Sequence, residues 1–189
     1  MRYGNRGKSF EKMIQTSNQQ YKFQNKAVVQ KIPTPVKVLD INPQTGNIRS
    51  GFYEQKSTVD YMGTYQGIAL AFEAKETNVE TRFDLSNIKE HQYSFLKSWV
   101  ASGGIGFILL QFSTLDEIYY LPFGLLEEYW EQMNNGGRKS IPYNEIAKED
   151  YKITNDGMIV VDYLAVVDEI FLDDSEEWTW FLALNIIKL

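Results

Sequence analysis

The chain has 189 residues, of which 43% are hydrophobic and 14% aromatic, so general disorder is excluded and one folded domain of ordinary size is expected. It has no cysteine and one histidine, His91, which excludes disulfide frameworks, thiolate zinc sites, cysteine nucleophiles and sites with two histidine ligands. The net charge of -6 alone disfavours a nucleic-acid partner, and the absence of a signal peptide and of any apolar run near ~18 residues predicts a cytoplasmic protein without a membrane span.

The charge is unevenly distributed along the chain. Residues 1–56 hold ten Lys and Arg but three acidic residues, whereas residues 57–189 hold nine basic and 22 acidic residues. This asymmetry has two explanations that stay open at this point. Either the basic part faces a polyanion, or the chain has a solvated surface with uneven charge.

The N-terminal third predicts a helix, a strand and an extended excursion. Residues 9–23 have apolar side chains at helical spacing, and Ser9 is a candidate cap. Residues 26–32 predict a strand. Two prolines then disfavour a helix, so residues 33–56 predict a hairpin-like excursion with a turn at 43–47. Four basic residues decorate the excursion and its base: Lys31, Lys37, Arg49 and Lys56.

Two neighbouring strands are expected next, over residues 57–64 and 67–75, joined near Gly63 and Gly67. The stretch from Ile68 to Phe72 is almost wholly apolar, which is typical of a central strand buried on both faces.

The rest of the chain alternates helices and strands, which indicates an α/β protein. Residues 163–171 are apolar and fit either a strand or a helix. The other expected elements are helices at 86–101 and 123–133, strands at 105–112 and 117–121, a short helix within 143–150, and an apolar tail at 178–189.

The chemistry centres on the end of the apolar strand. Side chains alternate along a strand, so Glu73 and Lys75 share one face, and Thr58 and Asp60 share a face of the preceding strand. If the two strands pair as a hairpin, Asp60 lies close to Glu73. Two adjacent carboxylates need a proton or a cation, and oxygen ligands favour Mg²⁺, with Mn²⁺ as a substitute. Lys75 would then orient a water molecule or offset charge on a phosphate.

The spacing Asp-x12-Glu-x-Lys is that of the PD-(D/E)xK nucleases. As a bare pattern it also fits a surface Glu73–Lys75 pair beside an unrelated Asp60. Gln92 faces inward on the helix 86–101, either as a satisfied core amide or as a group that holds the metal or its water. His91 turns about 100° away from Gln92, so we expect it at the surface or, at most, near a phosphate.

Several dispersed motifs resemble the RecU-type Holliday junction resolvases. They follow one another in the order of that family between about residues 3 and 171. The motifs are YGNRG at 3–7, KIPTPV at 31–36, STVDY at 57–61 with Gly63, FEAKET at 72–77, HQ at 91–92, GGRKSI at 136–141 and DYL at 162–164.

The resemblance implies a restriction-endonuclease-like core, in which helices flank a mixed central β-sheet and a stalk protrudes. Such proteins are Mg²⁺-dependent endodeoxyribonucleases that act as homodimers on four-way DNA junctions, in recombination and repair of low-GC Gram-positive bacteria and their phages. It further implies a RecA-type recombinase or a branch-migration helicase as a partner. We therefore expect residues 1–189 to form a single nuclease domain with a stalk at about 33–56.

The resemblance also assigns roles to residues. Thr58, Asp60, Glu73 and Gln92 would arrange the Mg²⁺, and Lys75 would stabilise the transition state. Glu11 resembles an additional acidic residue that borders such sites. The residues expected to contact DNA are Arg6, Lys31, Lys37, Arg49, Lys56, Arg138 and Lys139.

The chain departs from the family in its acidic charge, its short basic N-terminus and its apolar tail at 178–189. So compact a version suggests a phage-encoded member. Three alternatives stay open: another PD-(D/E)xK endonuclease that acts on duplex DNA, a non-catalytic protein that binds DNA or regulates a recombinase, and a structural protein that assembles through its tail.

Overall fold

A computed structural model of the chain describes residues 6–54, 58–154 and 157–171. The predicted apolar tail at 178–189 and Lys56 lie outside these ranges, as does the side chain of Arg6. Within them, no helix combines the length and the apolar character that crossing a bilayer requires.

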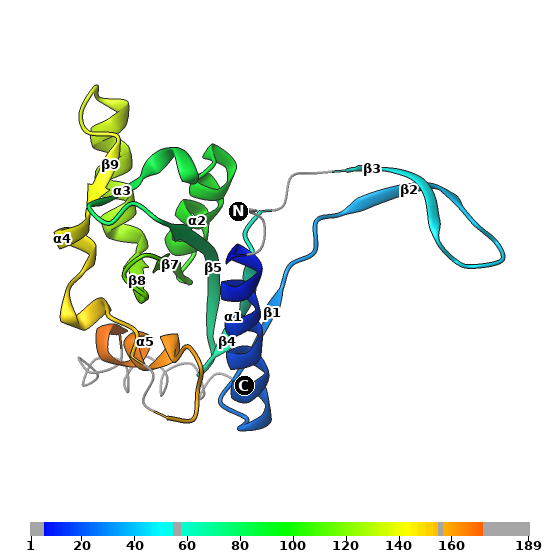
Figure 1. Cartoon of the computed structure of the whole chain (residues 1–189), viewed down its shortest axis with the longest axis horizontal. Helices are drawn as coiled ribbons and strands as arrows, with labels where there is room; N and C mark the ends of the chain where they lie inside the picture. The colour runs from blue at the N-terminus through cyan, green and yellow to red at the C-terminus, as the bar shows by residue number, and fades with distance from the viewer. Residues whose placement is uncertain (1–5, 55–57, 155–156, 172–189) are drawn as a thin grey trace, which may run out of the picture.

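The centre of the molecule is a five-stranded sheet (Figure 1). Its strands, in spatial order, are β1 (Ala27–Lys31), β4 (Tyr61–Tyr65), β5 (Ile68–Thr77), β7 (Ile105–Phe112) and β8 (Glu117–Pro122). β5 and β7 are parallel, and the other neighbours are antiparallel. The predicted α/β class with a mixed central sheet is therefore confirmed.

Helices cover both faces of this sheet. One face packs against α1 (Arg6–Phe23) and α5 (Tyr163–Phe171), and the other against α2 (Glu90–Ala101) and α3 (Phe123–Asn134). The segment 163–171 is thus a helix, which settles the choice that the sequence left open. The small elements are a sheet of β6 (Arg82–Asp84) and β9 (Ser140–Pro142), the helix α4 (Tyr143–Ile146), and the 3-10 turns η2 (Leu85–Asn87) and η3 (Glu149–Tyr151).

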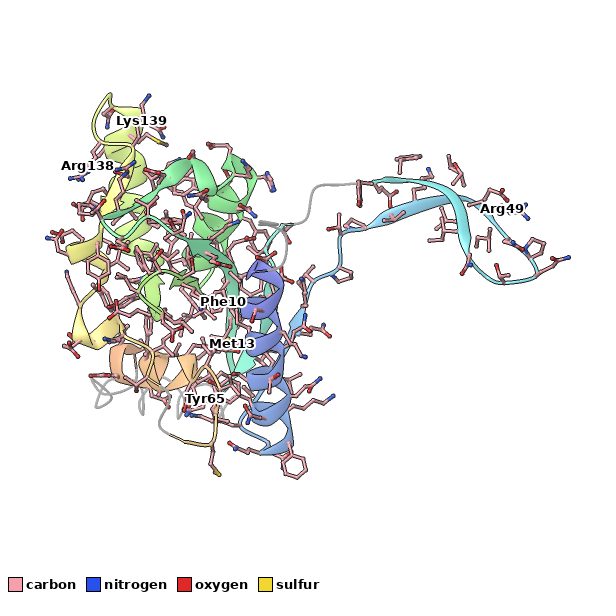
Figure 2. All side chains as sticks on the ribbon, in the orientation of Figure 1. Phe10, Met13, Arg49, Tyr65, Arg138 and Lys139 are labelled. Atoms are coloured by element: carbon pink, nitrogen blue, oxygen red, sulfur yellow. The ribbon has the colours of Figure 1, made fainter. Side chains whose placement is uncertain are left out.

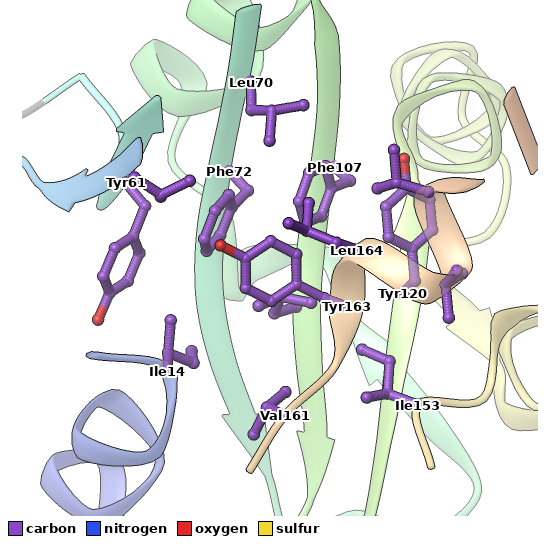
Figure 3. Packing of buried hydrophobic residues seen from close by; sticks show 14 of the residues in the cluster. Ile14, Tyr61, Leu70, Phe72, Phe107, Tyr120, Ile153, Val161, Tyr163 and Leu164 are labelled. Carbon is purple, nitrogen blue, oxygen red and sulfur yellow. The ribbon is translucent and has the colours of Figure 1, made fainter. Parts of the chain in front are cut away.

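Aromatic rings fill the core between the sheet and the pair α1 and α5. The ring of Phe72 on β5 stacks between Tyr61 and Phe107, with centroids 4.9 and 4.7 Å away, and Tyr163 of α5 lies 5.1 Å from it (Figure 3). Rings at these separations add to the burial of their apolar area. This layer fixes the position of β5, the strand that carries Glu73 and Lys75.

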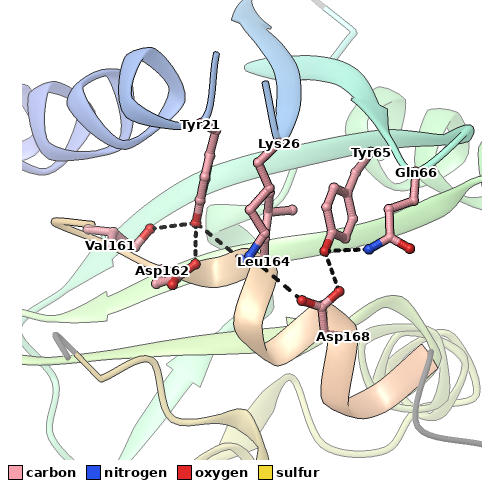
Figure 4. A network of polar contacts seen from close by, with 8 residues as sticks. All are labelled: Tyr21, Lys26, Tyr65, Gln66, Val161, Asp162, Leu164 and Asp168. Carbon is pink, nitrogen blue, oxygen red and sulfur yellow. Dashed lines mark hydrogen bonds and ion pairs between the residues drawn. The ribbon is translucent and has the colours of Figure 1, made fainter. Parts of the chain in front are cut away.

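A polar network fastens α5 and the residues before it to the rest of the domain. The hydroxyl of Tyr21 donates to Asp162 at 2.7 Å, and that of Tyr65 donates to Asp168 at 2.5 Å (Figure 4). Lys26 lies 3.7 Å from the same Asp168. The network joins α1, the residue before β1 and β4 to α5 and to Asp162 before it, so it holds α5 against the face of the sheet that α1 covers.

Several predicted boundaries were wrong. The helix α1 begins at Arg6, so Ser9 lies inside its first turn and does not cap it. Gly63 lies within β4: a side chain there would come within 2.3 Å of the Val28 carbonyl oxygen on β1. The turn consists of Gln66 and Gly67, both with positive φ. The helix predicted from residue 86 begins at Glu90, after the 3-10 turn η2.

Residues of the predicted excursion form a separate two-stranded antiparallel sheet of β2 (Val36–Ile41) and β3 (Ile48–Tyr53). Figure 1 shows this hairpin extending away from the body of the molecule. All residues of both strands are exposed, including the large side chains of Leu39 and Phe52. An isolated two-stranded hairpin has little stability of its own, so such a ribbon is suited to contact with a partner.

Candidate active site

The site lies at a step in the central sheet. β4 pairs with β5 only as far as Tyr61 opposite Phe72, whereas β5 continues beside β7 to Thr77. From Glu73 onward, β5 therefore has no strand partner on its β4 side. Asp60 precedes β4 directly and lies opposite Glu73 at this step.

Asp60 takes the place of the missing strand partner. Its Oδ2 accepts a hydrogen bond from the backbone N–H of Ala74 at 3.0 Å. Its carbonyl oxygen accepts the N–H of Ile32 at 2.8 Å, immediately before the chain leaves for the hairpin. The sequence placed Thr58 and Asp60 inside a strand, which was wrong, because both come before β4. The fixed Asp60 carboxylate nonetheless stands beside β5.

Glu73, Lys75 and Gln92 meet on the face of the sheet that α2 covers. The Glu73 side chain is only 1% exposed, and its Oε2 lies 3.0 Å from Nζ of Lys75. The same ammonium donates to Oε1 of Gln92 at 3.3 Å. Oε1 of Gln92 also accepts the backbone N–H of Lys89 at 2.9 Å, so this amide caps the start of α2 as well as facing the site.

The environment of Glu73 favours its neutral form. Burial raises the pKa of Glu73 to about 8, against the opposing effect of Lys75 and with a further contribution from the negative charge of Asp60. A buried carboxyl group that keeps its proton at neutral pH can exchange that proton for a metal cation. The positive charge of Lys75 alone therefore does not balance the negative charges of Asp60 and Glu73 at this site.

The donor set fits a hard divalent cation. Oε2 of Glu73 is buried, and the Lys75 ammonium lies 3.0 Å from it. Around it stand the carboxylate of Asp60 and the amide oxygen of Gln92, with Thr58 two residues before Asp60. Within residues 6–54, 58–154 and 157–171 no three His, Cys, Asp or Glu residues cluster as metal ligands. Mg²⁺ suits such a site, because it commonly binds one or two carboxylates plus water and substrate phosphate.

Glu11 lies beside this group: burial raises the pKa of Tyr61, and the charges of Glu11 and Asp60 raise it further. Glu11 lies on α1, and its carboxylate forms an ion pair with Lys31 at the end of β1. Its carbonyl oxygen accepts the hydroxyl of Tyr61 at 3.4 Å. In the described part of the chain, no hydrogen bond or ion pair links the Glu11 carboxylate to Asp60 or Glu73. The sequence did not predict the Glu11–Lys31 ion pair, which joins the acidic residue expected to border the site to a residue expected to contact DNA.

The other predicted DNA contacts lie on two separate surfaces. Arg49 is on the hairpin, where it lies 3.9 Å from Asp40, and Lys37 is exposed on the facing strand. Arg138 and Lys139 are exposed on the far side of the body from the hairpin (Figure 2). Phe10 and Met13, also labelled there, lie on α1 between the two regions. One DNA molecule would have to extend across the body to contact both surfaces of one chain.

Glu73 gives a prediction for the metal-free protein. A carboxyl group whose pKa rises from 4.5 unfolded to about 8 folded costs stability as pH increases between these values, because the unfolded chain loses its proton first. Glu73→Gln should therefore be more stable than the parent chain at pH 8 in chelator, by up to about 1.4 kcal/mol per pH unit above 4.5. The difference should shrink toward pH 5 in thermal unfolding.

Glu117 is the matched control for this measurement. A hydrogen bond from Tyr143, then contacts with Lys152 and Tyr119, lower the pKa of Glu117 despite partial burial. A lowered pKa contributes stability above the ordinary value, so Glu117→Gln should destabilise the fold at pH 8. If both variants lost stability at pH 8, the buried neutral state of Glu73 would be refuted.

A mixed sheet flanked by helices, with a glutamate and a lysine on a central strand and an aspartate beside that strand, is the arrangement of the PD-(D/E)xK class of nucleases. Comparison with known proteins narrows the class. The family model described as "RecU: Recombination protein U" matches residues 5–169. The chain belongs to the RecU family.

Curated relatives carry the name "Holliday junction resolvase RecU". Those of Staphylococcus aureus strains JH9 and COL are each 41% identical over 178 residues, which cover 93% of this chain and 86% of theirs. Among solved structures, the Holliday junction resolvase Hjc of Archaeoglobus fulgidus is similar with a TM-score of 0.35 and 10% identity, over 59% of this chain and 77% of that one. The second likeness is too weak to support an argument.

Proposed function

We propose that the protein is a Holliday junction resolvase: a metal-dependent endonuclease that makes paired symmetric nicks in four-way DNA junctions during recombination and repair. The observation that carries the proposal is the meeting of Asp60, Glu73 and Lys75 at the step in the sheet, in a chain of the RecU family. The buried Glu73 carboxyl group beside the Asp60 carboxylate, with Lys75 as its ion-pair partner, supports a cation at this point.

In the proposed mechanism, Asp60 and Glu73 would hold one or two Mg²⁺ ions, with Thr58 and Gln92 as neutral oxygen ligands. When bound, Mg²⁺ would supply a lowered pKa of a water ligand and polarisation of the phosphoryl oxygens. Lys75 donates to the attacked phosphate or to the attacking water, and its contacts with Glu73 and Gln92 hold its ammonium in place. The water oxygen would bond to phosphorus as the bond to the 3′-oxygen breaks. The water would give up a proton to solvent and the 3′-oxygen would take one up, which leaves a 5′-phosphate and a 3′-hydroxyl.

Paired nicks require two sites of opposite polarity, and we propose a homodimer that supplies them. A two-fold axis relates two sites in the way that the strands of a four-way junction are related. A RecA-type recombinase or a branch-migration helicase is the proposed class of protein partner. The mass of the protein in solution, by light scattering, tests the dimer.

We propose that the hairpin of β2 and β3 is the stalk that enters the junction. Its strands are exposed, and it carries Lys37 and Arg49. The chain enters the hairpin just after Ile32, whose N–H donates a hydrogen bond to the carbonyl of Asp60 in the candidate site. Deleting residues 36–50 should weaken the preference for a four-way junction over linear duplex more than it weakens general DNA binding. Competition binding measures both, with Lys97→Ala on α2 as the control variant outside the hairpin. An unchanged preference would refute the role.

The function is tested by incubating the protein with a labelled mobile junction and Mg²⁺, beside a linear duplex of the same sequence. We expect two nicks at symmetric positions in the junction and little cleavage of the duplex. Equal cleavage of both substrates would favour a general duplex endonuclease. Binding without any cleavage, across Mg²⁺ and Mn²⁺, would favour a non-catalytic DNA-binding protein.

A further inference from the structure

A polar cavity lies behind the candidate site, on the face of the sheet that α1 covers. It has a volume of about 450 Å³ and is lined by Ser9, Glu76, Gln111, Ser113 and Thr114. Glu76 directly follows Lys75 on β5, so the two side chains project from opposite faces of one strand. The cavity and the candidate catalytic site are therefore separated only by the end of β5.

Glu76 and Gln111 bring a carboxylate and an amide to the cavity. They stand opposite one another on the parallel strands β5 and β7, on the same face as Phe72 and Phe107. Both are half-buried, and neither side chain forms a hydrogen bond or ion pair with another residue of the described ranges. Both groups are therefore free to form hydrogen bonds with a ligand that enters the cavity.

The hydroxyl groups of Ser113 and Thr114 in the cavity already donate hydrogen bonds to the backbone. Ser113 Oγ donates to the carbonyl of Thr77 at 3.1 Å, and Thr114 Oγ1 donates to that of Asn78 at 3.0 Å. With their protons engaged, these oxygens present lone pairs to a ligand. Together with the Glu76 carboxylate they make the cavity rich in acceptors. Such a lining disfavours a phosphate, whose charge Glu76 would repel, and an apolar ligand, which would strand these polar groups.

We propose that this cavity receives the nucleobase that flanks the scissile phosphate, and that Glu76 and Gln111 select a base with an exocyclic amino group. A carboxylate accepts a hydrogen bond from such an amino group, and a glutamine amide both donates to and accepts from a base edge. Thymine has no amino group to offer Glu76. The inference rests on the proposed function, because it assigns the sequence preference of the same cleavage reaction.

The step in the sheet makes the cavity reachable from the scissile phosphate. Asp60 bonds to Ala74 at this edge, and beyond that bond β5 has no strand partner on its β4 side as far as Thr77, so a DNA strand can pass along this part of the edge. Lys75 and Glu76 are consecutive on β5, and their side chains project to opposite sides of this strand. A DNA strand that crosses the edge can therefore place a phosphate beside Lys75 and its neighbouring base beside Glu76.

The test maps nicks made by the full chain in mobile junctions whose crossover passes through randomised nucleotides. The parent chain should favour an amino-bearing base at one position next to the cut. Glu76→Gln replaces an acceptor-only group by one that also donates, so the preference over thymine at that position should fall about tenfold or more. Glu149→Gln, an exposed residue of η3 outside the cavity, should leave the preference unchanged.

The outcomes are separable. A parent chain that cuts no junction refutes the proposed function and this inference with it. A parent chain that cuts without a base preference beside the nick, or a Glu76→Gln variant with the parent's preference, overturns this inference alone. If Glu76→Gln does not cut, Gln111→Leu is mapped in its place, with folding of each variant checked by thermal unfolding. Folded but inactive forms of both variants would place the pair in cleavage itself and overturn base selection.

Discussion

Asp60→Asn is expected to reduce Mg²⁺-dependent cleavage of a four-way junction by about 1,000-fold or more, while junction binding persists. The substitution removes a negative charge from the proposed metal site, and a bound metal contributes several kcal/mol to stabilising the transition state. The amide oxygen of the substituted side chain can still accept the N–H of Ala74, so the local fold should be retained. Single-turnover cleavage and electrophoretic binding measure the two effects.

The control for this variant is Asp84→Asn. Asp84 lies on β6 and pairs with Arg82 at 2.8 Å, away from the step in the sheet. Its amide variant should cut at the parent rate. Mg²⁺-dependent nicking that survives Asp60→Asn would remove Asp60 from the site.

Lys75→Met is expected to lower the cleavage rate by about 100-fold or more, with Mn²⁺ binding retained at high pH. The ammonium is the one cation that lies against the Glu73 carboxylate in the described chain, at 3.0 Å, and a charged donor aimed at a phosphate is worth a few kcal/mol. Lys75 also lowers the pKa of Glu73, so its loss should raise that pKa further. Metal binding should then require a higher pH than in the parent chain.

Lys97→Met is the matched control, because Lys97 also forms ion pairs, with Glu127 at 2.8 Å, but does so on the outer side of α2 and α3. Titration with Mn²⁺ between pH 6 and pH 9 separates binding from catalysis. Lys75→Met cleavage within twofold of the Lys97→Met rate would show that Lys75 takes no part in the reaction.

The geometry around Glu73 was predictable because it depends on local periodicity. Alternation along β5 predicts that Glu73 and Lys75 share a face, and the structure has their charged atoms 3.0 Å apart. The short connection between two apolar segments predicts their antiparallel pairing, which the structure confirms and which brings Asp60 opposite Glu73. The roles of these residues in catalysis remain proposals.

Other features depend on contacts between distant segments, and no local pattern encodes them. The stretch before β4 does not pair with β5 as a strand. Instead, the Asp60 side chain accepts the N–H of Ala74, and the Asp60 carbonyl accepts the N–H of Ile32. The strands β6 and β9 have three residues each, too few for a period to appear. Gln92 was predicted to face inward, but its second role as a cap of α2 follows from where that helix begins.

The pocket of Glu76 and Gln111 was missed for a related reason. Each is an ordinary polar residue at the end of an apolar strand, and only the parallel register of β5 and β7 sets them side by side. The motif FEAKET contains Glu76, but the Glu-x-Lys spacing within it assigns a catalytic role to Lys75 and none to Glu76. The sequence therefore predicts functional residues on one face of β5 and none on the opposite face.

The central claim is that Asp60 and Glu73 hold a divalent cation at the step in the sheet. Its most direct test is anomalous diffraction at the manganese edge from crystals of the protein bound to a four-way junction in Mn²⁺. The account predicts an anomalous peak about 2.2 Å from carboxylate oxygens of both residues. A well-ordered structure with manganese bound elsewhere, and with none between Asp60 and Glu73, would contradict it.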